Sequence, residues 1–233
     1  MLEIIEEDCL RKLLETGSEC PIALLYLETG QLPARFQVQI MMLNFLKYIR
    51  QQEQNSLMSK FFRAQCNQPS KGDWVENIRK VIINIELNMS FEDIRQMKTN
   101  AFKKIVNAKV RKFAFNYLLS KLKSKGKEIY FGNNLHCQSY LCPNNLLTLQ
   151  EQRATFSYRS RMNILEYNFP GRQPVTEKCR CGEDIDNKHL YECQLLNSSE
   201  KIVTYDKIFG GRLIEMKHVV KIMIENEIKQ FFT

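Results

Sequence analysis

A long segment of helical periodicity, from about Thr99 to Lys123, limits most strongly what this chain can fold into. Its apolar residues recur every three or four positions, the spacing that places side chains on one face of an α-helix. We therefore expect a single long helix that buries one stripe of side chains. The members of that stripe, which fall within about a quarter turn of one another, are Phe102, Val106, Val110, Phe113 and Tyr117.

Shorter segments with similar periodicity predict a mostly α fold, because Gly and Pro residues punctuate a series of helix-like patterns. Asp73 is placed to cap a helix that begins at Trp74, and Ser90 with Asp93 approximates a capping box. A short strand near 129–131 is the exception. The other expected helices are 2–15, a segment after Pro21, 34–51, 56–65, Trp74 to about Leu87, a segment after Ser90, 148–166 and about 212–231.

The positive charge of the chain is concentrated in the same region as the long helix. The formal net charge is +8. Residues 94–127 contain 11 Lys and Arg residues and no Asp or Glu, whereas residues 1–93 carry a net −3 and residues 128–233 are neutral. The whole excess therefore lies in one block, and a clustered basic excess favours a polyanion as the partner.

This block supplies the candidate nucleic-acid-binding residues, since Lys and Arg side chains outside the apolar stripe can reach phosphates. Arg153, Arg159 and Arg161 form a smaller set on a later helix, in which one arginine is expected to be structural and one to reach phosphate; Arg159 and Arg161 are the candidates for binding. The alternative is a basic face that is simply solvated. The candidates in the block are Lys98, Lys103, Lys104, Lys109, Arg111, Lys112, Lys121, Lys123 and Lys125.

A candidate metal site follows the pattern C-x-C-x7-H-x3-C, formed by Cys179, Cys181, His189 and Cys193. Three thiolates and one imidazole suit tetrahedral Zn²⁺, and four protein ligands close its coordination sphere, so we expect a structural zinc site. The alternative is three buried cysteines and a surface histidine, although the segment around them is polar. A second cluster, His136-Cys137 with Cys142, is better interpreted as core or surface thiols.

Other features of the sequence indicate the cellular compartment and exclude several classes of enzyme. The acidic N-terminal segment, without an apolar core, argues against a signal peptide, and no stretch of about 18 uncharged apolar residues predicts a membrane span. The 8 cysteines are then expected to be free thiols or metal ligands in an intracellular protein, nuclear or cytoplasmic. No phosphate-binding loop, zinc-protease, hydrolase or dinucleotide motif is present, and no set of carboxylates suggests two-metal chemistry.

Several motifs resemble, in order, the region after the polymerase core of non-LTR retrotransposon reverse transcriptases. The segment Leu25 to Phe36, LYLETGQLPARF, is similar to the start of that region. Gln65 with Pro69 to Trp74 matches the Q-x3-P-x-K-G-D-W pattern of the same family. The remaining elements are Lys98, Phe102-Lys103, Ser124-Lys125, Tyr140-Leu141, Arg159-Ser160-Arg161-Met162, Asn168-Phe169 and the CCHC cysteines and histidine.

The resemblance implies a helical thumb and connector bundle with a small CCHC zinc knuckle and a C-terminal helix. It divides the chain into a thumb-like and connector region with the basic helix (1–127), an irregular segment and helix (128–170), the knuckle (171–200) and a helical tail (201–233). The family's polymerase aspartates and endonuclease centre have no counterpart here. The expected function is noncatalytic binding of template RNA or target DNA, with the missing upstream polymerase as a second partner; the alternative is a helical protein-interaction module.

Overall fold

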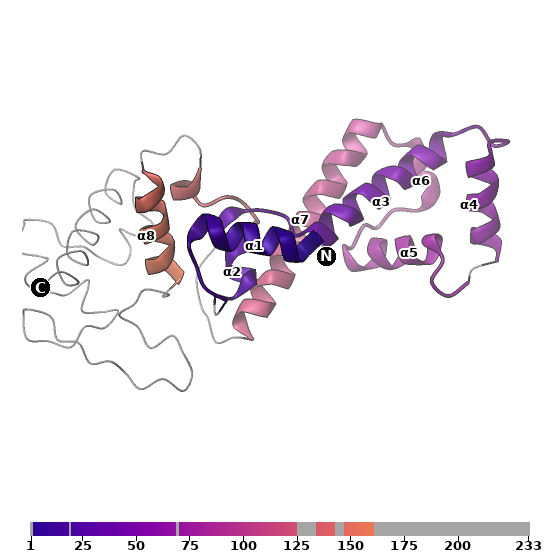
Figure 1. Cartoon of the computed structure of the whole chain (residues 1–233). Coiled ribbons are helices and arrows are strands. Elements are labelled where there is room, and N and C mark those ends of the chain that lie inside the picture. Colours follow the sequence, from indigo (N-terminus) through magenta and orange to yellow (C-terminus); the bar gives the residue numbers. More distant parts are fainter. Residues whose placement is uncertain (1, 19, 69, 125–133, 143–146, 161–233) are drawn as a thin grey trace, which may run out of the picture.

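A computed structural model describes residues 2–18, 20–68, 70–124, 134–142 and 147–160, and these are mostly helical, without a strand (Figure 1). The mostly α prediction is therefore confirmed for this part of the chain. No helix within it combines the length and apolar character needed to cross a membrane. The helices are α1 (Leu2–Leu14), α2 (Ile22–Thr29), α3 (Ala34–Gln51), α4 (Leu57–Asn67), α5 (Trp74–Asn84), α6 (Phe91–Gln96), α7 (Thr99–Lys123), the 3-10 turn η1 (Ser139–Leu141) and α8 (Leu149–Ser160).

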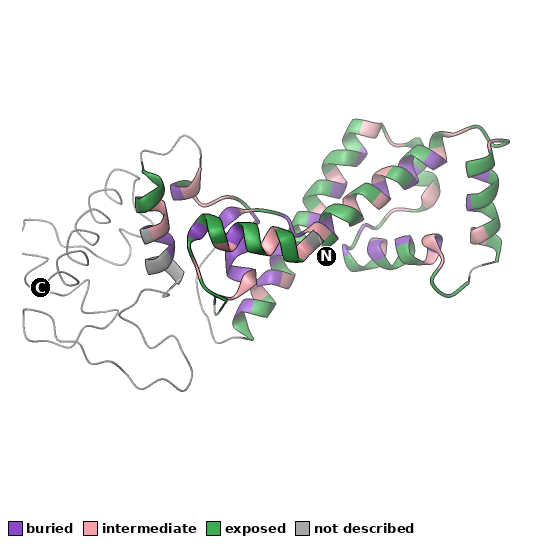
Figure 2. Cartoon of the chain, viewed as in Figure 1, coloured by how far each residue is buried: buried purple, intermediate pink, exposed green. Residues whose placement is uncertain are grey.

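The long helix α7 organises the bundle, because it packs against both α2 and α3. Besides α7, helix α3 contacts α1, α4, α5 and α6, and α8 lies beside α1 and η1. The described helices form an elongated body, with α8 near one end and α4 near the other (Figure 1). Burial is greatest at α2, where every residue from Ala23 to Thr29 is buried (Figure 2). Apart from Glu28 and Thr29, the buried residues of α2 are apolar, and a helix that is apolar around most of its circumference is expected at the centre of a core.

Most expected helix boundaries agree with the structure, and one differs. The expected helix from Trp74 to about Leu87 ends at Asn84, because Ile85 leaves the helix and Glu86 has a left-handed φ of 52°. The described part of the helix expected at 148–166 is α8. The expected strand near 129–131 and the expected helix at 212–231 lie outside the described residues.

The capping predictions have two different outcomes. Ser90 and Asp93 form a complete capping box: the Ser90 Oγ accepts from the Asp93 N–H at 3.1 Å, and the Asp93 carboxylate accepts from the Ser90 N–H at 2.8 Å. Asp73 does precede α5, but its carboxylate accepts from the Ser70 N–H at 2.7 Å and makes no cap bond to α5. The predicted start of α5 is right, while the predicted cap is wrong.

The N-terminus of α3 is capped from another helix, because its N-cap residue Pro33 offers no side-chain acceptor. Glu6 of α1 accepts from the Ala34 N–H at 3.0 Å, and Glu3 accepts from the Arg35 N–H at 3.2 Å. Glu6 also accepts from the Tyr26 hydroxyl at 3.1 Å. Carboxylates at a helix N-terminus are favourable for its exposed N–H groups and its dipole, so α1 helps to fix where α3 begins.

A buried lysine fixes the C-terminal end of α6, opposite the capping box. The Lys47 side chain of α3 is 2% exposed, and its ammonium donates to the carbonyls of Ile94 at 2.6 Å and Arg95 at 2.9 Å and to that of Met97. Carbonyls at the end of a helix lack partners within the helix and carry a partial negative charge, so a cation is favourable there. Burial still lowers the pKa of Lys47.

Candidate nucleic-acid interface

Most buried side chains of α7 follow a row with a spacing of four residues, and Phe115 is buried beside this row. Four residues turn an α-helix about 40° past a full turn, so this row winds around the helix. The winding differs from the expected stripe: Phe113 and Tyr117 are half-buried and pack at its edge, against Phe36 of α3 with ring centroids 5.9 and 5.7 Å apart. The row consists of Phe102, Val106, Val110, Ala114, Leu118 and Leu122, each at most 2% exposed.

Most of the predicted basic residues on and before α7 project into solvent. Lys109 is half-buried. Among the described residues, none of the α7 lysines has an Asp or Glu oxygen within the 4.0 Å of an ion pair. Within the described parts of the chain, no close carboxylate therefore neutralises their positive charge. The exposed members are Lys98, Lys103, Lys104, Arg111, Lys112, Lys121 and Lys123.

The middle of α7 presents three of these cations around small side chains. Lys104 and Arg111 are seven residues apart, nearly two full turns, so both lie on the same side of the helix about 10 Å apart along its axis. Lys112 follows on the neighbouring ridge. Asn107 and Ala108, both exposed, lie between them and leave the helix surface open to a close approach. This arrangement can place ammonium and guanidinium groups against successive phosphates.

Arg111 has a structural role as well. Its Nη1 lies 3.4 Å from the Gly30 carbonyl oxygen and 3.5 Å from the Leu135 carbonyl oxygen. These long hydrogen bonds connect α7 to the turn after α2 and to residues 134–138. A substitution of Arg111 would therefore affect folding and phosphate contact together, so Arg111 is a poor choice for testing an interface.

A second cluster of cations surrounds Tyr117. Arg35 of α3 donates from Nη1 to the Tyr117 hydroxyl at 3.0 Å, and its guanidinium carbon lies 5.0 Å from the ring centroid. Lys121 places its ammonium 5.6 Å from the same centroid. Arg35 is also paired with Glu3 at 2.9 Å. Cation–π contacts of this kind are weak at exposed sites, so Lys121 keeps its charge available at the surface.

The later predicted residues are placed only in part. Arg159 belongs to α8 by its backbone, whereas Lys125 and Arg161 lie outside the described residues. Arg153 has a structural role: its Nε donates to the Leu13 carbonyl at 3.0 Å, and it is paired with Glu15. It therefore holds α8 against the end of α1.

The four zinc ligands expected from the sequence, Cys179, Cys181, His189 and Cys193, also lie outside the described residues. Within the described parts, no group of three or more His, Cys, Asp or Glu side chains could hold a metal ion. The weak cluster at residues 136–142 consists of an exposed His136 and two half-buried free thiols. Burial, with added effects of Cys142 and Glu28, raises the pKa of Cys137 from 9.0 to about 11.

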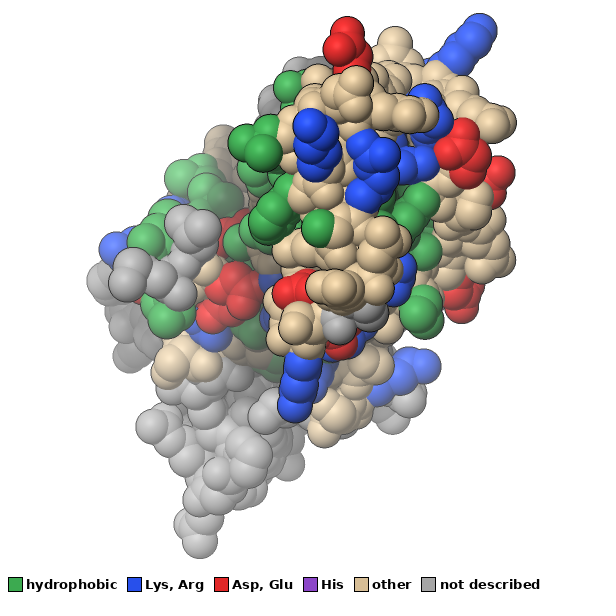
Figure 3. Space-filling view, turned by 90° about the vertical axis from the view of Figure 1, so that its right-hand side faces the viewer, with side chains coloured by type: hydrophobic (Ala, Val, Ile, Leu, Met, Phe, Trp, Pro, Cys, Tyr) green, Lys and Arg blue, Asp and Glu red, His purple; other side chains and the backbone are tan. Residues whose placement is uncertain are grey.

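Sequence reasoning missed one cluster of cations. Arg50, Arg63 and Arg95 line one pocket although they belong to three different helices. Their separation along the chain hides the cluster, and the only sequence signal is the absence of acidic residues close to Arg63. The end of the molecule formed by α4 and α5 carries Lys and Arg side chains beside exposed hydrophobic ones (Figure 3).

Comparison with known proteins gives no match to a protein-family model, a curated protein or a solved structure.

Proposed function

We propose that this chain is a noncatalytic nucleic-acid-binding module that grips the phosphates of RNA or DNA through the exposed face of α7. One observation supports this most directly: a helix of 25 residues carries solvent-exposed Lys side chains that have no carboxylate partner among the described residues. Its other face is anchored in the core, so the cations are presented on a rigid support. Such a support limits the conformational entropy lost on binding to the side chains themselves.

The expected binding mode is electrostatic and dependent on salt. Each phosphate that a Lys or Arg neutralises releases condensed counterions, so the affinity falls steeply as salt rises. No feature of the α7 face predicts readout of base edges. We therefore expect weak sequence preference and a strong preference for polyanions.

The experiment compares two double variants of the full chain by salt titration of oligonucleotide binding. Lys104→Gln with Lys112→Gln removes two exposed cations of α7, and Lys12→Gln with Lys71→Gln removes two exposed cations elsewhere. If α7 is the interface, the first variant reduces the slope of log affinity against log salt by about 2, at roughly 0.9 per phosphate contact. The control variant leaves the slope nearly unchanged. Equal effects of the two variants would reject α7 as the interface.

The origin of the chain is a further part of the proposal. We propose that it is the post-polymerase region of a non-LTR retrotransposon reverse transcriptase, and the support is the family order of the motifs from Leu25 to Cys193. The DNA flanking the gene tests this directly. An upstream reading frame that encodes polymerase aspartates is expected, and an independent promoter directly before the frame would contradict the proposed origin.

The same proposal includes a structural Zn²⁺ held by Cys179, Cys181, His189 and Cys193. Three thiolate sulfurs and one imidazole nitrogen are the donors that Zn²⁺ prefers, and a closed set of four supplies folding energy instead of catalysis. Elemental analysis of the purified full chain should give about one zinc per chain. Cys181→Ser should lower this content, whereas Cys9→Ser, at an exposed free cysteine, should not.

A second candidate function rests on an apolar face of α3. Four of its side chains, Val38, Met41, Phe45 and Tyr48, are between 41% and 69% exposed and recur every three or four residues. A stripe of this kind favours a protein-interaction module. Size-exclusion chromatography beside a gel-shift titration discriminates the two functions: a concentration-dependent complex without any oligonucleotide binding would favour the second.

A further inference from the structure

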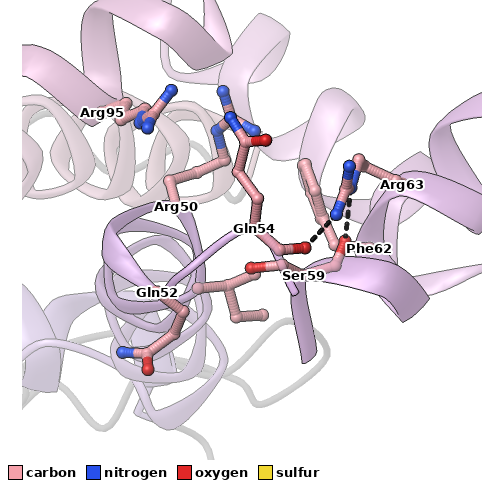
Figure 4. Close-up of a pocket in the computed structure, with 8 residues that line it drawn as sticks. Arg50, Gln52, Gln54, Ser59, Phe62, Arg63 and Arg95 are labelled. Atoms are coloured by element: carbon pink, nitrogen blue, oxygen red, sulfur yellow. Dashed lines mark hydrogen bonds between the residues drawn. The ribbon is translucent and has the colours of Figure 1, made fainter. Parts of the chain in front are cut away.

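A small pocket opens where the C-terminal end of α3 meets α4 and α6 (Figure 4). Its volume is about 230 Å³. Pockets for drug-sized ligands usually measure about 300 to 1,000 Å³, so this pocket suits a smaller group with some water. Its lining includes the apolar ring of Phe62, two amides and three guanidinium groups, from Gln52, Gln54, Arg50, Arg63 and Arg95.

The three guanidinium groups reach the pocket from different segments. Arg50 belongs to α3, Arg63 to α4 and Arg95 to α6. In the view of Figure 4, the Gln54 side chain extends between the Arg63 side chain and those of Arg50 and Arg95. The fold thus brings to one pocket three cations that are far apart in the sequence, and all three would attract an anion there.

Backbone carbonyls hold two of these arginines in place. Arg50 donates from Nε to the Phe91 carbonyl at 3.3 Å, and its guanidinium carbon lies 5.6 Å from the Phe62 ring centroid. Arg63 donates from Nε to the Ser59 carbonyl at 3.3 Å and from Nη2 to the Gln54 carbonyl. Each guanidinium has five N–H donors, so these bonds orient the groups and leave further donors for a ligand.

The charges in the pocket do not balance among the described residues. Glu92 is the carboxylate that pairs with this cluster, at 2.9 Å from Arg50 Nη2 and 3.7 Å from Arg95 Nη1. Arg63 makes no ion pair in the described part of the chain. Three guanidinium groups against one carboxylate leave two positive charges, and the side chain of Arg50 is only 21% exposed.

We propose that this pocket binds a phosphate group. Guanidinium forks match the oxygens of a phosphate in pairs, and the surplus of two positive charges matches the charge of a phosphate near neutral pH. The proposal does not depend on the α7 interface, since free phosphate would fill the pocket as well. The end of α3 that borders the pocket also contacts the start of α7, where Gln51 donates to the Thr99 hydroxyl at 3.2 Å.

The test measures thermal unfolding of the full chain in inorganic phosphate and in chloride at equal ionic strength. Phosphate also stabilises proteins non-specifically, because it is excluded from their surface. Variants are therefore needed to separate the stabilisation that comes from binding in the pocket. Arg63→Gln with Arg95→Gln should lose the extra stabilisation by phosphate, while Lys12→Gln with Lys71→Gln should keep it. Phosphate stabilisation that is equal in both double variants, or no greater than that in chloride, would overturn the proposal.

Glu92→Gln should raise the affinity for phosphate, the opposite of the effect of the arginine variant. A folding defect would not produce such an increase. Removing the competing carboxylate should tighten phosphate binding several-fold, although the ion pairs of Glu92 with Arg50 and Arg95 are lost. Phosphate binding that is unchanged or weaker in a folded Glu92→Gln protein would count against the pocket. None of these variants alters α7, so a failed α7 interface and a failed pocket give different results.

Short oligonucleotides with and without a 5′-phosphate distinguish the sources of the group. If the arginine double variant loses affinity only for the phosphorylated oligonucleotide, the pocket holds a terminal phosphate. An equal loss for both oligonucleotides assigns a backbone phosphate to it. If neither affinity changes while the effect of inorganic phosphate is lost, the ligand is a free phosphate.

Discussion

The Tyr140 hydroxyl donates a 2.7 Å hydrogen bond to the carboxylate of Glu28, which lies 112 residues earlier in the chain, and the two side chains are at most 1% exposed. The backbone of the same glutamate takes part, because its carbonyl accepts from the Gln138 N–H at 2.9 Å. One residue of the central helix α2 therefore fixes the segment 134–142 through both its side chain and its main chain. This segment is the described link between α7 and α8.

Removing the Tyr140 hydroxyl should be costly. Hydrogen bonds to charged groups contribute about 1.5–3 kcal/mol, so Tyr140→Phe is expected to lower the free energy of unfolding by about 2 kcal/mol. Urea unfolding followed by circular dichroism measures this. The matched control is Tyr48→Phe, at a side chain that is 54% exposed, which should change stability by less than about 0.5 kcal/mol. Equal effects of the two substitutions would show that the Glu28 contact adds little.

Substitution of two glycines with positive φ distinguishes the cost of backbone strain from the cost of steric overlap. Gly30 has φ +66°, and a Cβ there would lie 2.1 Å from the Cys137 nitrogen. Gly72 has φ +91° and nothing within 4 Å of its Cβ position. Gly72→Ala should therefore cost about 1 kcal/mol, from backbone conformation alone. Gly30→Ala should cost clearly more, because the segment 134–142 must also move, and urea unfolding of both variants checks the difference.

The buried ammonium of Lys47 should be needed for the end of α6. Lys47→Met keeps most of the length and the apolar part of the side chain but leaves three carbonyl oxygens, one buried and two part-buried, without their donor. A buried acceptor that loses its partner costs about 1–3 kcal/mol, so a loss of at least 2 kcal/mol is expected for the group. Lys60→Met on exposed α4 is the control and should change stability little. A stable Lys47→Met protein would contradict this capping role.

Local signals in the sequence were sufficient to predict much of the helical architecture. The bounds of α3 follow from Pro33 and a regular apolar pattern, and the start of α6 follows from Ser90 and Asp93. Local rules work here because they depend on residues a few positions apart. They fail for the Asp73 side chain, since the Ser70 N–H competes successfully for its carboxylate.

Long-range contacts account for what could not be predicted. The expected stripe of α7 assumed one packing direction, but α7 packs against both α2 and α3, so its buried row winds from Phe102 to Leu122. Arg111 turns partly toward Gly30 and Leu135 for the same reason. The role of a charged side chain depends on which segments the fold brings to it, and spacing along the chain does not contain that information.

Alkaline conditions should destabilise the fold through Cys137. Burial, Cys142 and Glu28 raise the pKa of its thiol from 9.0 to about 11, so between these values the unfolded chain loses this proton first. The folded state then binds more protons than the unfolded state, and stability falls as pH rises through this window. Burial also raises the pKa of Tyr26, which acts in the same direction.

Cys137→Ala retains Tyr26, so the comparison of the two proteins isolates the thiol. Urea unfolding should be measured at about pH 8.5 and about pH 10.5, which lie roughly on either side of the ordinary thiol pKa. Between these two values the free energy of unfolding should fall more in the wild type than in Cys137→Ala. Parallel losses would mean that Cys137 ionises equally easily in both states.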